Sequence, residues 1–497
     1  MTSPLQTVHV RVNDAATGKP TPARVRFTDS AGNYHAPFGR LATFATGRGK
    51  DVGGNLLLGR KEFAYIDGGC EIALPPGQLH VEIHKGPEYI PVNEEVLLTA
   101  GKLSLRFALQ RWSDMRRDGW HAGDCRAHFL SPFAALLEGR AEDLAIVHLL
   151  AHEHTVDGVP AVANLLAFSG QQHALAGPDC LVTVNTLNVH AVLGSLGLLH
   201  CHRIVFPLGF GGPAGQDDWT LADWCDQCHR KQGLVIWART RHQAGGLASG
   251  EPLADLILGK IDAFELEPGD YLSGGDAAGG DSAGAVLHDW YDLLNAGIRV
   301  PLVGSSGKES NTCQLGSMRT YARLAPGDEF SGKSWIEAVR RGATFITNGP
   351  LLSLTANGHD PGQIVDLPAH GELLVRVEAR SVAAFDHLEL VQNGTVIAQA
   401  TPSGSPGSAT LELRLPAEES QWLAARCRGT QQLFAHTSAL HVRIAGKPAQ
   451  RVPAALARLT TSLERLNDWA RSKARCDDRQ RARLTGIFEE ALRTLVR

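Results

Sequence analysis

The sequence predicts an α/β protein of four parts: an N-terminal antiparallel β-sandwich domain (1–110), a region of alternating strands and helices (111–350), a C-terminal antiparallel β-sandwich domain (351–446) and a helical tail (447–497). Three observations carry this prediction: apolar and polar residues alternate in the two outer β regions, continuous apolar runs alternate with helical patterns in the middle, and apolar stripes at helical spacing follow Pro453. A chain of 497 residues also exceeds the size at which one hydrophobic core stops growing.

The N-terminal part contains short alternating runs separated by turn residues. These runs are 7–12, 23–28, 79–84 and 103–109. Short strands at this spacing favour a small antiparallel sandwich that needs no chemistry of its own.

The middle part contains apolar runs that read as buried strands, and helical patterns lie between them. The runs are 144–151, 180–184, 203–208, 234–238, 261–266 and 300–303, and two helices are expected at 221–232 and 288–296. Fully apolar strands alternating with helices indicate a parallel sheet covered on its faces. A β/α barrel and an open sheet both satisfy this pattern.

Alternation returns in the C-terminal part, and a helical tail follows it. Strands are expected at 373–379, 387–392, 395–398, 410–415 and 440–444, with a hairpin turn at Asn393-Gly394. The tail carries two apolar stripes: Leu456, Leu459, Leu463, Leu466 and Trp469, then Leu484, Ile487, Phe488, Ala491, Leu492 and Leu495. We expect the tail to pack on the rest of the chain, with a homo-oligomer contact through these helices as the alternative.

Charge and composition argue against several classes of partner. The net charge is -4 and no basic stripe is present, so we expect neither a nucleic-acid partner nor a membrane partner. The amino terminus lacks the basic and apolar regions of a signal peptide, which predicts a cytoplasmic protein. Nine scattered cysteines, an odd number, are typical of reduced thiols. Cys225 and Cys228 have the spacing of a haem-attachment motif but fall inside an expected amphipathic helix, so we interpret them as helix thiols.

The polar segment 119–128, Gly-Trp-His-Ala-Gly-Asp-Cys-Arg-Ala-His, is the most informative part of the sequence. Polar residues at the carboxyl ends of apolar strands face the mouth of a β/α barrel. With this segment the chain resembles the carbaryl-hydrolase-like (CehA/McbA) branch of the PHP metallohydrolase superfamily. The resemblance covers residues 1 to 370 and is clearest at 123–128, 142–144, 293–305 and 335–354. It implies a PHP-like β/α barrel and metal-assisted hydrolysis of an ester, amide, carbamate or phosphoester.

Most metal ligands of that family are replaced in this sequence. The family motif Gly-Asp-x-His-x-His has Arg126 at its first histidine and keeps His128. The family motif Ala-His-Pro is replaced here by Ala-Arg-Thr, in which Arg239 takes the place of the histidine. In the family motif Gly-Ser-Asp-x-His, Ser306 takes the place of the aspartate and Lys308 that of the histidine. The family's Asp-His-Asn is matched by Ala151-His152-Glu153, and His190 matches a family histidine near a lost acid at Asn185-Thr186.

Basic side chains therefore stand where the family holds cations. We expect Arg126, Arg239 and Lys308, with Ser306, to bind a small anionic ligand such as a carboxylate or phosphate. The candidates for catalysis are His128 or His190 as base, together with Asp124 and Cys125, because a neighbouring cation would lower the pKa of that thiol.

Two alternatives remain open from the sequence. One divalent metal (Zn, Mn or Fe) could be retained by His128, His152, His154 and His190, since three imidazoles suffice for a catalytic zinc. For the function, the leading interpretation is a divergent hydrolase with Arg and Lys in place of metal ligands. The alternative is a catalytically inactive small-molecule-binding or scaffold protein, because fold alone does not decide activity.

Overall fold

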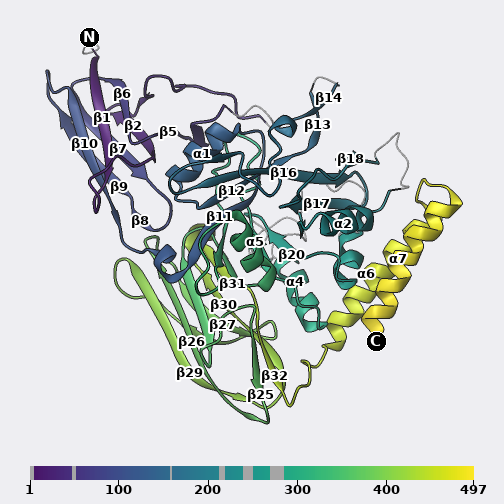
Figure 1. The fold of residues 1–497 in the computed structure, drawn as a ribbon. Coiled ribbons are helices and arrows are strands. Elements are labelled where there is room, and N and C mark those ends of the chain that lie inside the picture. The colour runs from purple at the N-terminus through teal and green to yellow at the C-terminus, as the bar shows by residue number, and fades with distance from the viewer. Residues whose placement is uncertain (1–4, 48–51, 157–158, 212–218, 239–249, 269–284) are drawn as a thin grey trace.

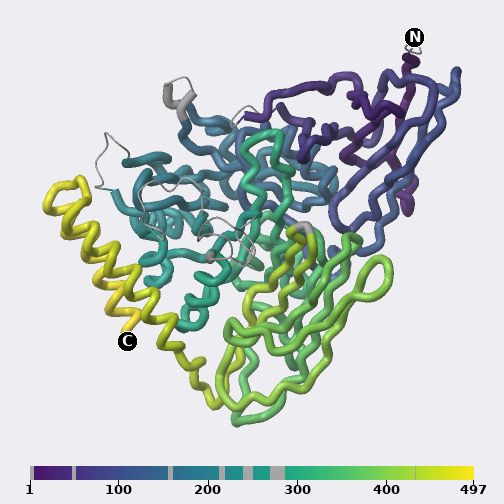
Figure 2. The backbone as a smooth tube through the Cα atoms, turned by 180° about the vertical axis from the view of Figure 1, so that it is seen from behind, coloured from purple at the N-terminus to yellow at the C-terminus, as the bar shows by residue number. Residues whose placement is uncertain are grey.

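The computed structural model describes residues 5–47, 52–156, 159–211, 219–238, 250–268 and 285–497. The chain is a sheet-rich mixed α/β protein, with the N-terminal strands on one side of the central region and the C-terminal helices on the other (Figure 1). The view from behind shows the same separation between the N-terminal strands and the tail (Figure 2).

The N-terminal part forms two sheets around a core of its own. Its strands are β1 (Gln6–Asp14), β2 (Ala23–Asp29), β3 (Tyr34–His35), β4 (Asn55–Leu58), β5 (Lys61–Ile66), β6 (Gly69–Leu74), β7 (Gly77–His84), β8 (Tyr89–Ile90), β9 (Val92–Leu98) and β10 (Ser104–Arg111). The sheet orders are β6-β1-β10-β8 and β4-β5-β2-β7-β9, and β3 pairs with β2. Val8, Val10 and Val12 are fully buried, as the period-two pattern predicts.

One pairing in this part differs from the antiparallel prediction. β1 and β10 run parallel, with His9 opposite Ser104 and Asp14 opposite Leu109. The first and last strands of the region are therefore neighbours, and the intervening strands form the long connection that a parallel pair requires.

The central part carries most of the helices. Its elements are β11 (Trp120–Ala127), α1 (Pro132–Ala141), β12 (Ile146–Ala151), β13 (Glu153–Val156), β14 (Val159–Val162), β15 (Leu175–Ala176), β16 (Leu181–His190), β17 (Gly194–Leu199), β18 (Gly209–Phe210), α2 (Leu221–Arg230), β19 (Leu234–Trp237), α3 (Pro252–Ile257), β20 (Ala263–Leu266), α4 (Ala285–Asn295), β21 (Leu302–Gly304), β22 (Arg319–Arg323), α5 (Gly332–Arg341) and β23 (Thr344–Thr347). Short 3-10 turns lie at Met115–Asp118, Leu165–Ala167 and Thr430–Gln432.

Parallel pairing brings strand ends of this part to one edge. β11, β12 and β16 are parallel, as are β19, β20 and β21, whereas β17 pairs antiparallel with both β16 and β19. Beyond β21 the backbone returns to the end of β11: the Gly307 amide donates to the Arg126 carbonyl at 3.1 Å, and the His128 amide donates to the Lys308 carbonyl at 2.9 Å. The carboxyl ends of β11 and β21 therefore meet.

The strand predicted at 203–208 is wrong. Residues 203–208 form no strand, and the unpredicted strand β17 (Gly194–Leu199) takes the place between β16 and β19. Pro207 has no amide to donate to a ladder, and the Asn188 side chain donates to the carbonyls of Val205 at 2.9 Å and Pro207 at 2.8 Å.

The C-terminal β part shares a sheet with the central part. Its strands are β24 (Leu351–Ala356), β25 (Ile364–Leu367), β26 (Gly371–Ser381), β27 (His387–Gln392), β28 (Thr395–Ala400), β29 (Gly407–Ala417), β30 (Gln421–Arg428), β31 (Phe434–Thr437) and β32 (Leu440–Ile444). β24, β26 and β29 form one sheet, and β23 pairs with β31 across the predicted boundary at residue 350. The predicted hairpin is confirmed: Asn393 and Gly394 join β27 to β28 with φ of 49° and 87°.

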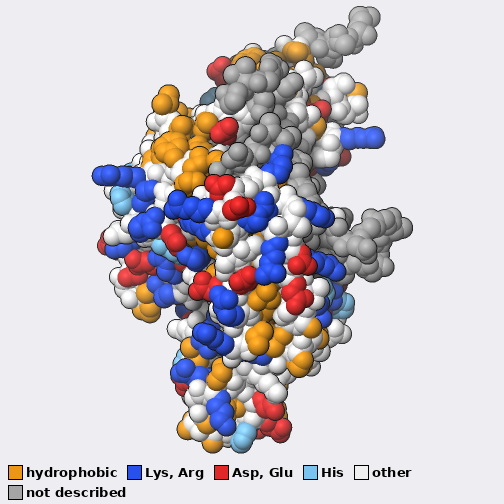
Figure 3. All heavy atoms as spheres, turned by 90° about the vertical axis from the view of Figure 1, so that its right-hand side faces the viewer, with side chains coloured by type: hydrophobic (Ala, Val, Ile, Leu, Met, Phe, Trp, Pro, Cys, Tyr) orange, Lys and Arg blue, Asp and Glu red, His pale blue; other side chains and the backbone are white. Residues whose placement is uncertain are grey.

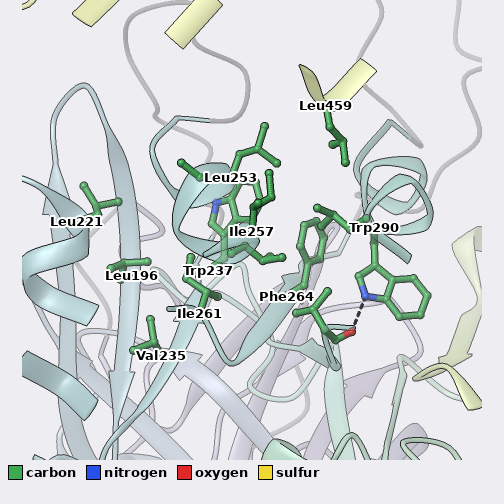
Figure 4. Packing of buried hydrophobic residues seen from close by; sticks show 14 of the residues in the cluster. Leu196, Leu221, Val235, Trp237, Leu253, Ile257, Ile261, Phe264, Trp290 and Leu459 are labelled. Atoms are coloured by element: carbon green, nitrogen blue, oxygen red, sulfur yellow. Dashed lines mark hydrogen bonds between the residues drawn. The ribbon is translucent and has the colours of Figure 1, made fainter. Parts of the chain in front are cut away.

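The tail consists of α6 (Pro453–Ser472) and α7 (Asp478–Val496), which pack on the central helices. Leu459 points toward the cluster that contains Leu253, Phe264 and Trp290, and the Trp290 ring nitrogen donates to the Val300 carbonyl at 3.0 Å (Figure 4). Packing of the tail on its own chain is confirmed. On the face that the tail helps to form, Lys and Arg side chains are interspersed with Asp and Glu (Figure 3). Within the described ranges no helix has the length and apolar character needed to cross a membrane.

Candidate functional site

Asp124 ties the segment after β21 to strand β11. Its carboxylate accepts hydrogen bonds from the Ser306 amide (3.1 Å), the Ser306 hydroxyl (2.5 Å), the Gly316 amide (2.8 Å) and the Arg126 amide (3.2 Å). Burial raises its pKa, and these hydrogen bonds act in the opposite direction. Asp124 is fully buried and occupied by loop contacts, so it shapes the site instead of reacting at its surface.

Arg126 lies between two carboxylates. Its Nε donates to Glu265 Oε1 at 3.0 Å, its Nη2 forms an ion pair with Glu267, and its Nη1 lies 3.3 Å from His128 Nε2. Burial disfavours the guanidinium charge, but the carboxylates outweigh it and raise the pKa of Arg126. The positive charge of Arg126 is therefore compensated within the protein, because two acids arrive from β20 and the residue just beyond it.

Lys308 has a partner of its own. The ammonium is fully buried, donates to the carbonyls of Cys313 at 2.7 Å and Ser310 at 3.3 Å, and lies 3.5 Å from the Glu138 carboxylate on α1. Ser306, the other residue predicted to bind the anion, donates to Asp124 and accepts from the Lys308 amide at 3.2 Å. Both side chains hold the loop after β21. Arg239 lies outside the described residues.

Cys125 points away from these polar groups. Its thiol is 1% exposed, packs among apolar residues such as Ile146 and Trp335, and lies 3.5 Å from the Thr320 hydroxyl. Burial raises its pKa, which is the reverse of the lowered pKa expected of a nucleophile. The catalytic assignment of Cys125 does not fit this environment, because successive residues of a strand point to opposite faces.

Three of the predicted histidines form a row. The ring centres of His128 and His152 are 4.7 Å apart, and those of His152 and His154 are 5.5 Å apart. Phe129 packs against His152 and His154 at 5.2 and 5.0 Å. His190, at the end of β16, accepts from the amides of Val192 and Leu193 through Nδ1 at 3.2 and 3.1 Å.

The described donor atoms around Arg126 face other protein groups and, as arranged, do not converge on a cation position. His128 Nδ1 lies 3.2 Å from the Leu150 carbonyl and its Nε2 faces Arg126, while the carboxylates of Glu265 and Glu267 face the same guanidinium. Among the described residues no group of three or more His, Cys, Asp or Glu side chains is placed to hold a metal ion. A divalent ion would have to displace Arg126 from its acids.

Sequence reasoning missed the acids Glu138, Glu265 and Glu267. A signal for two of them was present, since Glu265 and Glu267 alternate with apolar residues at the carboxyl end of the predicted strand 261–266. An acid on the buried face of such a strand requires a partner, and Arg126 is that partner. Glu138 lies on α1 and is fully buried.

Comparison with known proteins identifies no family. No protein-family model matches the chain, and no curated protein matches it. Solved structures match weakly. PsfC from Pseudomonas syringae has a TM-score of 0.28 and 12% sequence identity, and the match covers 44% of this chain and 88% of PsfC. A putative α-galactosidase from Bacteroides fragilis has a TM-score of 0.24 and 8% identity over 88% of this chain and 98% of its own, and a Bacteroides uniformis β-glucuronidase has a TM-score of 0.18 and 12% identity over 89% of this chain and 60% of its own. Similarities of this size carry no functional conclusion.

Proposed function

We propose that this chain is a catalytically inactive, PHP-like binding or scaffold protein in which the Arg126 guanidinium stands where the family holds metal. The proposal rests on one observation: Arg126 is buried between Glu265 and Glu267. The fold that we propose is a β/α barrel flanked by two β-sandwich domains and followed by the helical tail.

The pairing of the central strands supports the barrel. Parallel neighbours run from β11 to β16 and from β19 to β21, β17 joins the two groups, and hydrogen bonds at Gly307 and His128 link the segment after β21 to β11. A barrel requires a closed order of strands, and these links are consistent with one; in a barrel, the carboxyl ends of the strands would form the mouth that contains Arg126.

Physical chemistry favours the inactive state over a metallohydrolase. A guanidinium stays charged at any physiological pH and offers a planar fork of donors that matches carboxylates. A divalent ion beside it would meet repulsion of several kcal/mol at the effective dielectric of such sites. His128 Nε2 faces an Arg126 N–H, so this nitrogen is already accepting a hydrogen bond and is not available to take a proton from water.

The divergent hydrolase remains the second candidate because of the row His128, His152 and His154. Three imidazoles on one side of the mouth are the ligand type that zinc prefers. In that case the substrate would be a small anionic ester, amide, carbamate or phosphoester.

A metal inventory of the purified protein, together with assays on ester, carbamate and phosphodiester substrates, distinguishes the two candidates. We expect substoichiometric zinc, manganese and iron, and no hydrolysis with or without added metal. Stoichiometric tightly bound metal, or hydrolysis that requires added metal, would overturn the proposal.

A variant pair tests the surrogate role of Arg126 directly. Arg126→Ala leaves two carboxylates without their guanidinium, so we expect it to bind Mn²⁺ at least about tenfold more tightly than wild type does. The matched control carries Arg126→Ala with Glu265→Gln and Glu267→Gln and should lose this gain. Equal Mn²⁺ affinity in wild type and Arg126→Ala would contradict the surrogate role.

A further inference from the structure

A cavity of about 560 Å³ lies where the N-terminal, central and C-terminal parts of the chain meet. Arg24 and Lys85 line it from the N-terminal sheets, Glu142 and Arg319 from the central part, and Ser381 from strand β26. None of these residues belongs to the candidate site at the mouth.

The lining holds more positive than negative charge. Arg24, Lys85 and Arg319 are 6%, 2% and 3% exposed, and Glu142, at 1%, is the carboxylate among the lining residues. His84 also lines the cavity, and burial lowers its pKa to about 4, so it is neutral at pH 7. Three cations minus one carboxylate leave a surplus of two positive charges in the lining.

The single acid is fully used by its neighbours. Glu142 Oε1 accepts from Arg24 Nη1 at 3.0 Å and from the Tyr65 hydroxyl at 2.9 Å, and its Oε2 accepts from the Gln314 amide at 2.8 Å. Its charge therefore balances Arg24 only.

The other two cations are held by neutral backbone groups. Lys85 donates to the carbonyls of Pro22 at 3.2 Å and Arg140 at 2.5 Å, and Arg319 donates to those of Gly316 at 2.9 Å and Glu142 at 2.7 Å. In the part of the chain that the structure describes, no carboxylate lies within 4 Å of either charge. Carbonyl oxygens orient these groups but do not neutralise them.

The side chain of Arg24 also has an N–H group that lacks a hydrogen-bond acceptor among the described residues. Its Nε is buried, and no hydrogen-bond acceptor reaches it among the described residues. A buried N–H that has lost water without gaining a partner is unfavourable, and so is a buried charge without a counter-ion. Both deficits are removed by a ligand that brings oxygen acceptors and negative charge.

The next layer of residues does not remove the surplus. Asp143 pairs with Arg111 at 2.9 Å and Arg116 at 3.4 Å and also attracts Lys85 from beyond ion-pair distance, so three cations meet one carboxylate there. Glu88 pairs with the same Arg111 at 2.9 Å. Even with Glu88 counted as ionised, the two acids of this layer only balance its two arginines, Arg111 and Arg116.

We propose that this cavity binds a small molecule bearing a dianionic oxyanion group, either a phosphate or a pair of carboxylates, through Arg24, Lys85 and Arg319. A dianion matches the surplus of two charges. Bound there, the ligand would bridge all three parts of the chain and stabilise their mutual arrangement. The proposal concerns a different cavity from the barrel mouth and holds whether or not the mouth is catalytic.

Calorimetric titration of the full-length protein with inorganic phosphate, and with malonate in a second arm, tests the proposal at constant ionic strength. Wild type should bind at least one of the two dianions, whereas acetate, a monoanion, should bind at least about tenfold more weakly. Phosphate should also raise the melting temperature of wild type above its value in chloride.

Two lysine variants provide the matched comparison. Lys85→Met removes a cavity cation held by two carbonyls, and we expect phosphate or malonate affinity to fall by about tenfold or more. Lys308→Met removes a buried cation that is also held by two carbonyls but is paired with Glu138, and its affinity should stay within about twofold of wild type. Equal losses in both variants, or no binding by wild type, would overturn the proposal.

If either variant fails to fold, the structure of a wild-type crystal soaked in phosphate or tungstate tests the proposal without a substitution. Density between Arg24, Lys85 and Arg319 is expected. Density confined to other surfaces, or none, would show that the cavity is not an anion site.

Discussion

The proposed mouth around Arg126 and the cavity between the three parts both bury basic side chains, but their charge balance differs. At the mouth, Arg126 faces Glu265 and Glu267, and Lys308 faces Glu138. In the cavity, the single carboxylate, Glu142, pairs with Arg24, whereas Lys85 and Arg319 are held by backbone carbonyls. Buried arginines and lysines therefore indicate an anion site only after the surrounding acids are counted, and by that count the cavity is the better candidate.

The largest expected effect comes from removing the cation at the mouth. Arg126→Met leaves Glu265 and Glu267 buried without their guanidinium, so the free energy of unfolding should fall by about 3–5 kcal/mol. Urea denaturation measures it.

The control for Arg126→Met is Arg376→Met. Arg376 also pairs with two acids, Glu378 and Glu412, but its side chain is 53% exposed. That variant should lose far less stability than Arg126→Met, because water screens an exposed ion pair. Similar losses in the two variants would mean that burial at the mouth does not strengthen the dependence on Arg126.

Removing Glu142, the single acid of the cavity, tests how negative charge in the lining affects stability and phosphate binding. Glu142→Gln deletes the ion pair with Arg24 and raises the surplus of positive charge, so in chloride we expect a loss of about 3 kcal/mol. Phosphate should then bind about tenfold more tightly than to wild type, because one more positive charge is uncompensated. Titration calorimetry checks the affinity, and weaker phosphate binding in Glu142→Gln would argue against an anion site.

Local patterns in the sequence predicted where the strands lie better than they predicted which strands pair with each other. The period-two alternation located β1, β7, β27 and β32 because burial alternates along each strand and depends on neighbouring residues alone. The parallel pairing of β1 with β10 joins residues that lie almost a hundred positions apart, and no local pattern encodes that choice. The apolar run 203–208 misled for a related reason, because the side chain of Asn188 holds its carbonyls outside the sheet.

The site shows the same limit. The family resemblance grouped Asp124, Arg126, His128 and Lys308, and the backbone bonds between the ends of β11 and β21 agree with that grouping. The charge state of the group depends on Glu265, which is 139 positions from Arg126, and on Glu138 in α1. The cavity is still less visible, since Arg24, Arg319 and Ser381 come from three separate parts of the chain.

The pH dependence of stability tests the acid beside the cavity. Burial raises the pKa of Glu88 to about 7 from an ordinary value of 4.5. The unfolded chain therefore releases this proton first, and the contribution of Glu88 to stability falls as pH rises from about 4.5 to 7 and is constant above that range. The total change is at most about 3 kcal/mol.

Glu88→Gln isolates this contribution. The unfolding free energy of the variant minus that of wild type should rise between about pH 4.5 and 7 and then level. If this difference did not change with pH, Glu88 would have its ordinary pKa and would be ionised well below pH 7. Arg111 would then be paired with two charged acids, and the positive charge beside the cavity would be smaller.

The smallest effect is expected at Cys125, and it tests whether reactive groups face the mouth. Its thiol is 1% exposed and burial raises its pKa, so iodoacetamide should label the partly exposed Cys70, Cys313 and Cys476 well before Cys125 in the folded protein. Cys125→Ala should cost about 1 kcal/mol of stability, the typical loss of a small buried group. Mass spectrometry after native labelling, with a denatured sample as the control, reads out the order of modification. If Cys125 were labelled as early as the partly exposed cysteines, strand β11 would have to open to solvent. The proposed mouth would then be more mobile than the cavity, despite its ion pairs.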